Sequence, residues 1–330
     1  MIRAFAPGRV NLIGDHTDHS GGLVLPMAID LGTTIEGHRR GDSVVLRSAD
    51  EGAPAIVPVD VEDPGAVEPG WARYVAGVVA EVRPANGFDG TVTTTLPIGA
   101  GLSSSAALEV AVALAVGFGG SSLELAQLGQ RAEQRASGVP CGIMDQLASA
   151  AGVEGHALRI DCTTLEVTPV PVPDDVEVVV LHSGQDRALA DSAYAERATA
   201  VQAAQAELGP LRDVDVSGIA DPVIRRRARH VVTENARVDA FAAALSAGDH
   251  VRLGALMAAS HASLRDDFEV STPVVDALVT RLSAIDGVIG ARLTGAGFGG
   301  CVVALVEPGT PLPDDLRTWR VQASSGAGLR

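Results

Sequence analysis

The side chains that could do chemistry are concentrated near the start of the chain, in residues 8–22, GRVNLIGDHTDHSGG. This stretch holds an arginine, two aspartates and two histidines, bordered by glycines and flanked by apolar runs. Four interpretations fit these residue types: a metal site, part of a hydrolase triad, a sugar-binding loop, and a polar turn without chemistry. The choice among them depends on the rest of the chain.

Two of these interpretations are disfavoured by the chain itself. A zinc site built from Asp15, His16, Asp18 and His19 would need nearly consecutive residues to converge on one ion, with nothing elsewhere to support them. A serine hydrolase of the common kind carries Gly-x-Ser-x-Gly, which the chain lacks. A sugar-binding loop is chemically reasonable, because carboxylates accept strong paired hydrogen bonds from vicinal hydroxyls.

A second segment, residues 96–107, LPIGAGLSSSAA, predicts a phosphate-binding loop. It runs from the end of an expected strand through two glycines into a helix that begins with three serines. The free N–H groups at a helix start attract phosphate, and glycines let the backbone approach a bulky anion. All 25 basic residues are arginine, so the lysine of a Walker A loop is missing. Residues 295–300, GAGFGG, match a dinucleotide fingerprint only formally, since a strand follows them.

Composition excludes several classes of protein. The net charge of −16, from 41 acidic and 25 basic residues, disfavours a nucleic-acid partner. No uniformly apolar run reaches eighteen residues, so we expect no membrane partner. The N-terminus lacks the pattern of a secretory signal, and three widely spaced cysteines fit neither a disulfide framework nor a zinc ribbon. We therefore expect a cytoplasmic protein.

Hydrophobic periodicity predicts two domains, residues 1–173 and 174–330, divided at the Pro-rich segment that begins at Val167. In the first we expect strands over 3–6, 22–29 and 88–96, a hairpin formed by 33–39 and 43–48, and helices over 71–82, 105–116 and 123–137 with another starting near 144. In the second we expect a strand over 176–181, helices between 188 and 282, strands over 290–294 and 301–307, and a frayed tail over 323–330.

Three segments together resemble the motifs of the GHMP small-molecule kinases, in their usual order. They are residues 8–18, GRVNLIGDHTD, residues 101–107, GLSSSAA, and residues 293–301, LTGAGFGGC. The opening segment is similar to the signature of the galactokinase branch of that superfamily. Residues 141–146, CGIMDQ, and 260–267, SHASLRDD, are similar to further segments of the same branch.

This resemblance implies an α+β fold of two domains, a ribosomal-S5-like N-terminal domain and a ferredoxin-like C-terminal domain with the active site between them. It implies that ATP, as co-substrate with Mg²⁺, phosphorylates the anomeric hydroxyl of galactose to give galactose 1-phosphate. The expected partners are therefore small molecules, a sugar and ATP, and the oligomeric state, monomer or dimer, stays open.

The resemblance also implies the roles of individual residues. Asp145 would act as a general base or orient the anomeric hydroxyl, and Arg9 would stabilise charge on the transferred phosphoryl group. Asp18 would bind the 3- and 4-hydroxyls of the sugar, and Asp15 and His16 would face the 6-hydroxyl. The sugar site would be completed by Thr17, Gly142 and Tyr194. The metal ligands would be Ser105 and Glu133. The ATP site would comprise the residues of the glycine–serine loop, Gly99, Ala100, Gly101, Leu102, Ser103, Ser104 and Ser105.

The opening segment departs from the family pattern in two places. The usual signature reads Glu-His-Thr-Asp-Tyr-Asn, whereas this chain reads Asp-His-Thr-Asp-His-Ser over residues 15–20. The acid at 15 is one methylene shorter where the sixth carbon of the sugar is expected, which leaves open a kinase for a related sugar such as L-arabinose. A sensor that binds sugar and ATP without catalysis is the third hypothesis, although no expected catalytic residue is missing.

Overall fold

A six-stranded sheet, with strand order β13-β1-β3-β6-β4-β5, organises the first half of the chain. The computed structural model describes the whole chain except residues 98–99, 139–140 and 187–189. β1 (Ile2–Asn11) and β3 (Pro26–Arg39) form the longest antiparallel pair, and β3 also pairs antiparallel with β6 (Phe88–Thr94). The sheet ends with β4 (Ser43–Ser48) and β5 (Ala55–Pro58), and β13 (Gly328–Leu329) lies at its other edge.

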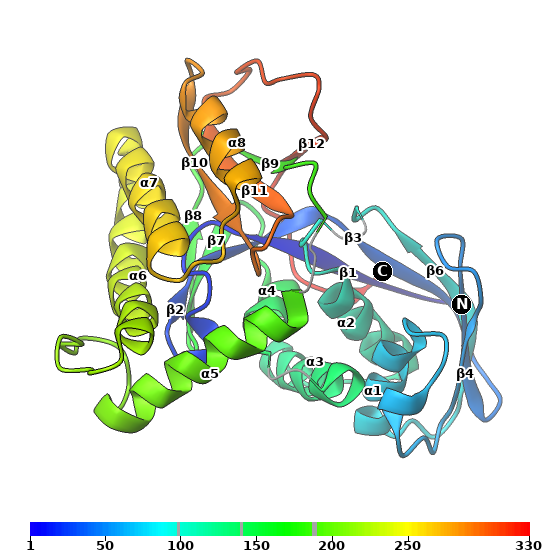
Figure 1. Cartoon of the computed structure of the whole chain (residues 1–330). Helices are drawn as coiled ribbons and strands as arrows, with labels where there is room; N and C mark the ends of the chain where they lie inside the picture. The colour runs from blue at the N-terminus through cyan, green and yellow to red at the C-terminus, as the bar shows by residue number, and fades with distance from the viewer. Residues whose placement is uncertain (98–99, 139–140, 187–189) are drawn as a thin grey trace.

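Four helices cover one face of this sheet (Figure 1). They are α1 (Ala72–Val82), α2 (Ser104–Val116), α3 (Ser122–Ser137) and α4 (Met144–Ala151). α2 is rich in alanine and almost wholly buried, and it packs against both β1 and β3. Small side chains let this helix lie close to the strands, so its N-terminus meets the end of β1.

The second half of the chain builds an antiparallel sheet with the order β10-β11-β9-β12. Its strands are β9 (Glu177–His182), β10 (Val288–Thr294), β11 (Cys301–Val306) and β12 (Thr318–Val321). The helices of this half are α5 (Ala190–Leu208), α6 (Pro222–Ala247), α7 (His250–Asp266) and α8 (Pro273–Ser283). β9 begins shortly after the boundary predicted at residue 173, which stays a prediction.

A small sheet, β2-β7-β8, lies at the seam between the two halves. It comprises β2 (Leu23–Val24), β7 (His156–Asp161) and β8 (Val167–Pro171), and α6 packs against both β2 and β8. Val238 and Phe241 of α6 belong to the same buried cluster as the first sheet and its helices. The two halves therefore share a continuous core where the sugar loop is expected.

The hairpin predicted over 33–39 and 43–48 is wrong. Both strands exist, but β6 lies between them, antiparallel to β3 and parallel to β4. The turn at Gly41-Asp42 predicted a local pairing, whereas burial of Phe88 and Val92 of β6 favours the long-range arrangement. Local turn chemistry does not reveal such an insertion.

The frayed tail predicted over 323–330 is also wrong. β13 pairs with β1, and the N–H groups of Gly326 and Ala327 donate to the carbonyls of Gly152 and Ser149. The backbone of Arg330 donates to the carbonyl of Arg3, so the two chain ends lie together, as Figure 1 shows. A polar, glycine-rich composition indicated flexibility, but these backbone bonds fix the segment to the first sheet.

Deleting residues 326–330 should lower the free energy of unfolding by at least about 3 kcal/mol, because three backbone hydrogen bonds to Gly152, Ser149 and Arg3 are lost at about 1 kcal/mol each, together with the pairing of β13 with β1. Equilibrium unfolding in urea measures the change. Arg330→Ala, which keeps the backbone bonds, serves as the control and should cost about 1 kcal/mol or less. Equal stability of the truncated and full chains would contradict the prediction.

Candidate active site

A two-pronged ion pair between Arg9 and Asp145 lies at the centre of the candidate site. Nε of Arg9 donates to Oδ1 of Asp145 over 2.7 Å, and a second guanidinium nitrogen donates to Oδ2 over 2.6 Å. Arg9 lies near the end of β1 and is only 6% exposed, and Asp145 lies in the first turn of α4. The paired geometry fixes the orientation of the carboxylate.

The glycine–serine loop closes around this ion pair. The carbonyl of Gly101 accepts a 2.7 Å bond from Arg9, and the hydroxyl of Ser103 donates to Oδ2 of Asp145 over 2.5 Å. The backbone of Arg9 donates to the carbonyl of Leu102. A Cβ at Gly8 would lie 2.5 Å from that carbonyl, so the close approach of strand and loop requires glycine there.

The side chains of Ala100 and Leu102 are buried, so this part of the loop offers its backbone to a ligand. Ser103 has a left-handed backbone (φ 59°) just before α2, and Ser104 is exposed in the first turn of that helix. This arrangement suits a phosphate group at a helix N-terminus. Gly99, also predicted to bind ATP, lies outside the described residues.

Ser105 and Glu133 come together from neighbouring helices, with the serine hydroxyl 3.1 Å from Oε1 of the glutamate. Burial raises the pKa of Glu133, and the nearby charge of Asp145 raises it further. Two oxygen ligands from the protein, with phosphate and water completing the shell, suit Mg²⁺, so this pair fits the ion that the sequence predicts.

Glu109 and Gln146 support this pair and had no role in the sequence prediction. The side-chain amide of Gln146 donates to Oε2 of Glu133 over 2.5 Å and to Oε2 of Glu109 over 3.0 Å. Glu109 is completely buried, and burial followed by the charge of Glu133 raises its pKa well above the usual value. Its signal in the sequence was a lone acid within the apolar helix at 105–116.

The loop around Asp18 forms the other side of the site. The hydroxyl of Thr17 donates to the carbonyls of Gly14 and Leu23 and holds the loop in shape. Asp18 lies against Gly142, where a Cβ would come within 1.9 Å of the carboxylate. A hollow of about 320 Å³ opens beside these two residues and gives a small polar ligand access to them.

The pKa of Asp18 is raised from 3.8 to about 6. Burial is the main cause, and the charge of Asp145 adds to it, while a backbone hydrogen bond from His19 acts in the opposite direction. The pKa of His19 is lowered to about 4 by burial and by the neighbouring His230, so this imidazole is neutral at pH 7. The loop thus presents a carboxylate that gains from hydrogen-bond donors such as sugar hydroxyls.

Aromatic side chains line the loop near His16. The ring of His16 lies 4.6 Å from that of Phe268 and 5.6 Å from that of Tyr194, which comes from α5. His19 meets the edge of Tyr194 at 5.9 Å. The structure therefore brings Tyr194 to the loop from the second half of the chain, beside the residues that the sequence assigned to the sugar.

The side chain of Asp15 is bonded to residues of the second half of the chain. One carboxylate oxygen is ion-paired with Arg292 of β10, and the other accepts a 2.8 Å bond from the backbone of Gly295. Arg292 also donates to the carbonyl of Leu12 over 2.7 Å. The side chain of Asp15 is 2% exposed and that of Arg292 is completely buried. Arg292 was missed by the sequence prediction, although it is a lone charge in an apolar strand.

Side chains of α6 hold the backbone of the same loop. The carboxylate of Glu234 accepts a 3.0 Å bond from the N–H of Gly14. His230 places Nε2 3.1 Å from the carbonyl of Asp15, and because a carbonyl can only accept, this nitrogen carries the proton. Burial lowers the pKa of His230, so the ring donates in its neutral form. The second half of the chain thus fixes the sugar loop from behind.

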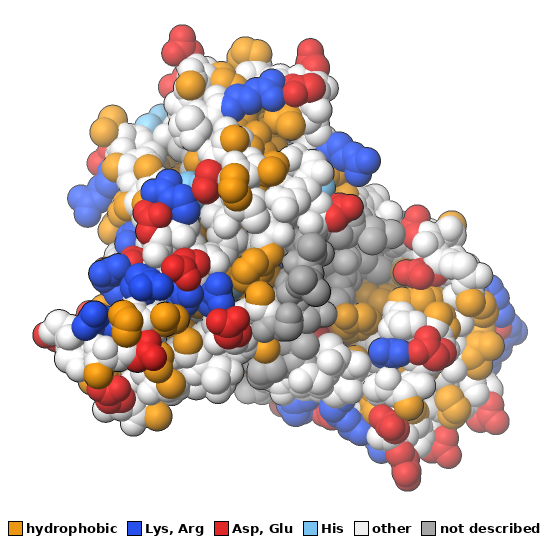
Figure 2. All heavy atoms as spheres, viewed as in Figure 1, with side chains coloured by type: hydrophobic (Ala, Val, Ile, Leu, Met, Phe, Trp, Pro, Cys, Tyr) orange, Lys and Arg blue, Asp and Glu red, His pale blue; other side chains and the backbone are white. Residues whose placement is uncertain are grey.

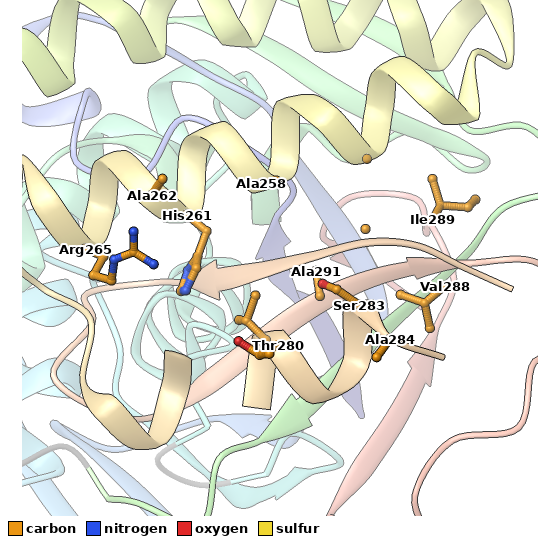
Figure 3. Close-up of a pocket in the computed structure, with 13 residues that line it drawn as sticks. Ala258, His261, Ala262, Arg265, Thr280, Ser283, Ala284, Val288, Ile289 and Ala291 are labelled. Carbon is orange, nitrogen blue, oxygen red and sulfur yellow. The ribbon is translucent and has the colours of Figure 1, made fainter. Parts of the chain in front are cut away.

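A second hollow, of about 460 Å³, lies between α7, α8 and β10 (Figure 3). Its two ionisable side chains already have partners: Nε2 of His261 is 3.1 Å from Asp276, and Arg265 pairs with Asp266 at 2.8 Å. Most of the remaining wall is made of small or apolar side chains. We therefore place the chemistry at the smaller hollow, which is lined by Asp18 and by several polar side chains, among them His19 and Gln130.

The arginine cluster at 225–229 is paired with acids. Arg226 and Arg227 bind Glu269, and Arg229 binds Asp267. In Figure 2 the basic groups on the left of the visible face have acidic groups beside them. In the described part of the chain, no helix has the length and apolar character to span a membrane.

Comparison with known proteins identifies the family. A model of the galactokinase galactose-binding signature matches residues 2–39, and models of the GHMP kinase N- and C-terminal domains match residues 73–153 and 241–320. The chain is also similar to Lactococcus lactis galactokinase, solved with galactose, at 33% identity and a TM-score of 0.90 over 99% of this chain and 94% of that one. The chain belongs to the galactokinase family.

Two further structures share the fold with this galactokinase-family chain. A mevalonate kinase matches at 21% identity and a TM-score of 0.68, covering 98% of this chain and 99% of its own. The mevalonate kinase of Methanococcus jannaschii matches at 20% identity and 0.69, covering 98% of each chain. The expected two-domain GHMP kinase fold is confirmed, and ATP is the co-substrate of this superfamily.

Asp18→Asn should stabilise the protein at pH 8 by about 3 kcal/mol and leave stability unchanged near pH 4. The raised pKa means that the folded state prefers protonated Asp18. The contribution of protonated Asp18 to the free energy of unfolding is therefore fully present below about pH 4 and is lost as pH rises through 6. Asparagine carries no charge at any of these pH values and avoids the loss.

Urea unfolding of Asp18→Asn at pH 4 and pH 8 measures this difference. The exposed Asp213→Asn is the matched control and should show no such dependence. If Asp18→Asn were no more stable than the wild type at pH 8, burial of the ionised carboxylate of Asp18 would not destabilise the folded state.

Proposed function

We propose that this protein transfers the terminal phosphoryl group of ATP to the anomeric hydroxyl of galactose, giving galactose 1-phosphate. One observation carries the proposal: the Arg9–Asp145 pair is bonded to both Gly101 and Ser103 of the glycine–serine loop. A carboxylate that can orient a hydroxyl therefore lies next to a loop suited to phosphate. Phosphoryl transfer needs this positioning and the neutralisation of charge.

The nucleotide phosphates would lie on the loop at 100–105, held by backbone N–H groups and by the start of α2. The guanidinium of Arg9, only partly neutralised by Asp145, would then face the transferred phosphoryl group. Arg9 stabilises the charge that builds up on the phosphoryl oxygens, and it does so from a buried position, where such interactions are stronger than in water.

Asp145 would accept a hydrogen bond from the anomeric hydroxyl and direct its oxygen at the γ-phosphorus. The new bond joins that oxygen to phosphorus, the bond to the departing ADP oxygen breaks, and the proton passes to Asp145. The transition state of phosphoryl transfer is loose, so the anomeric hydroxyl loses its proton late. Orienting that hydroxyl is therefore the main contribution of Asp145 to the rate. The contacts to Arg9 and Ser103 keep the carboxylate in place.

The sugar would be held by Asp18, Gly142 and Tyr194. Its hydroxyls would donate hydrogen bonds to the half-buried carboxylate of Asp18. Ser105 and Glu133 would hold Mg²⁺ through oxygen, with Gln146 fixing the glutamate. Bound there, the ion supplies positive charge to the phosphates. Several acids crowd this site, so a divalent cation also offsets their repulsion of ATP.

The test is release of ADP from ATP with galactose as acceptor. Asp145→Asn should lower kcat by 10²- to 10⁴-fold, the usual range for a positioned acid–base group, when it is assayed at a temperature at which the variant remains folded. Asp266→Asn, an exposed aspartate of α7, is the matched control and should retain full activity. Activity close to wild type in Asp145→Asn, or ATP binding without turnover of any sugar, would sink the proposal; the latter would favour the sensor.

Glu133→Gln should raise the Mg²⁺ concentration for half-maximal rate at least tenfold, with a much smaller effect on the KM for ATP at saturating Mg²⁺. The amide is a poorer ligand for a hard cation than the carboxylate. Rates measured against Mg²⁺ concentration give the result, and Glu207→Gln on the exposed face of α5 is the control. An unchanged Mg²⁺ requirement would remove Glu133 from the metal site.

A further inference from the structure

Asp15 occupies the position at which the family signature places a glutamate facing the sixth carbon of the sugar. In this structure both of its carboxylate oxygens are already bonded to other parts of the protein. One is ion-paired with Arg292 and the other accepts from the backbone of Gly295, and only 2% of the side chain is exposed. Its position in the signature predicts a sugar contact, but its bonding is that of a residue inside the protein.

The length of the side chain limits how far the carboxylate of Asp15 can reach. Aspartate is one methylene shorter than glutamate and reaches about 1.5 Å less far. From its place in the loop, Asp15 meets the guanidinium of Arg292, which is itself completely buried and bonded to the carbonyl of Leu12. Turning toward the sugar would leave that guanidinium buried without its counter-charge, a larger loss than one hydrogen bond to a hydroxyl returns.

The surface next to Asp15 is aromatic. His16, the other residue assigned to the sixth carbon, packs its ring against Phe268 and Tyr194. The faces of these rings favour contact with carbon, whereas their hydrogen-bonding atoms, the imidazole nitrogens and the Tyr194 hydroxyl, lie at the ring edges. A methyl group or a hydrogen atom could therefore take the place of the hydroxymethyl group without leaving a buried carboxylate unsatisfied.

We propose that Asp15 is a positioning residue locked by Arg292, and that the enzyme therefore also phosphorylates galactose-configured sugars without a 6-hydroxyl, namely 6-deoxygalactose and L-arabinose, with kcat/KM within about 100-fold of that for galactose. The inference rests on the proposed function and extends it to a wider class of substrate. Asp15 and Arg292 set the position of the loop that carries Asp18, and the sugar is bound through its other hydroxyls.

The deciding measurement is kcat/KM of the wild-type protein for galactose, 6-deoxygalactose and L-arabinose, followed by ADP release. We expect the three values to lie within about 100-fold of one another, because discrimination at the sixth carbon is weak when no carboxylate binds the 6-hydroxyl. A site built to bind the 6-hydroxyl would reject 6-deoxygalactose by about 10⁴-fold. A preference for galactose of more than about 100-fold would overturn the inference while leaving the proposed function intact.

Asp15→Asn separates positioning from sugar contact. If Asp15 positions the loop, KM should rise for galactose and 6-deoxygalactose by the same factor, the ratio of their kcat/KM should stay within about threefold of wild type, and the KM for ATP should hardly change. If Asp15 bound the 6-hydroxyl, only the kcat/KM for galactose would fall, and its ratio to the kcat/KM for 6-deoxygalactose would approach one.

Asp15→Asn leaves Arg292 without its partner and could prevent folding, so the double variant Asp15→Asn/Arg292→Met is measured beside it. The double variant removes both buried charges, and the same constant ratio is expected. A ratio that changes in either folded variant contradicts the inference, and if neither folds, the wild-type comparison decides. Absence of turnover with all three sugars would overturn the proposed function, and the inference with it.

Discussion

The ion pair between Arg9 and Asp145 is the interaction on which the site depends. It joins three parts of the chain that are distant in sequence: the end of β1, the loop before α2 and the first turn of α4. Removing one member of such a shielded pair typically costs about 3–5 kcal/mol, because the other charge remains without compensation. Stability and catalysis therefore share the same contacts, and neither residue can be exchanged without affecting the other.

A concentration of acidic groups surrounds this pair. The pKa of Asp18, Glu133 and Glu109 is raised in each case, with burial as the leading cause and a neighbouring carboxylate as the next. Such crowding opposes folding, yet it suits a site that must attract hydroxyl donors and a divalent cation. The protein tolerates the acids because the Gln146 amide and the Arg9 guanidinium supply donors between them.

Much of the site could be predicted because its signals are local. Glycines followed by serines at a helix start, and a dense run of acids and histidines, report chemistry within a dozen residues. Arg292 and Glu234 could not be placed in this way, since their partners Asp15 and Gly14 lie more than two hundred residues earlier. The same reason explains the missed pairing of β4 with β6: it depends on which distant strand fills the core, and no turn residue reports that.

The return of β13 to β1 has a consequence for how the protein behaves at high concentration. Without it, the first part of the strand that carries Arg9, around Ala4 and Phe5, would expose unpaired N–H and C=O groups at the edge of the sheet. Such an edge can recruit a strand from another molecule and begin aggregation. By capping the edge with two of its last residues, the chain protects its catalytic strand from intermolecular pairing.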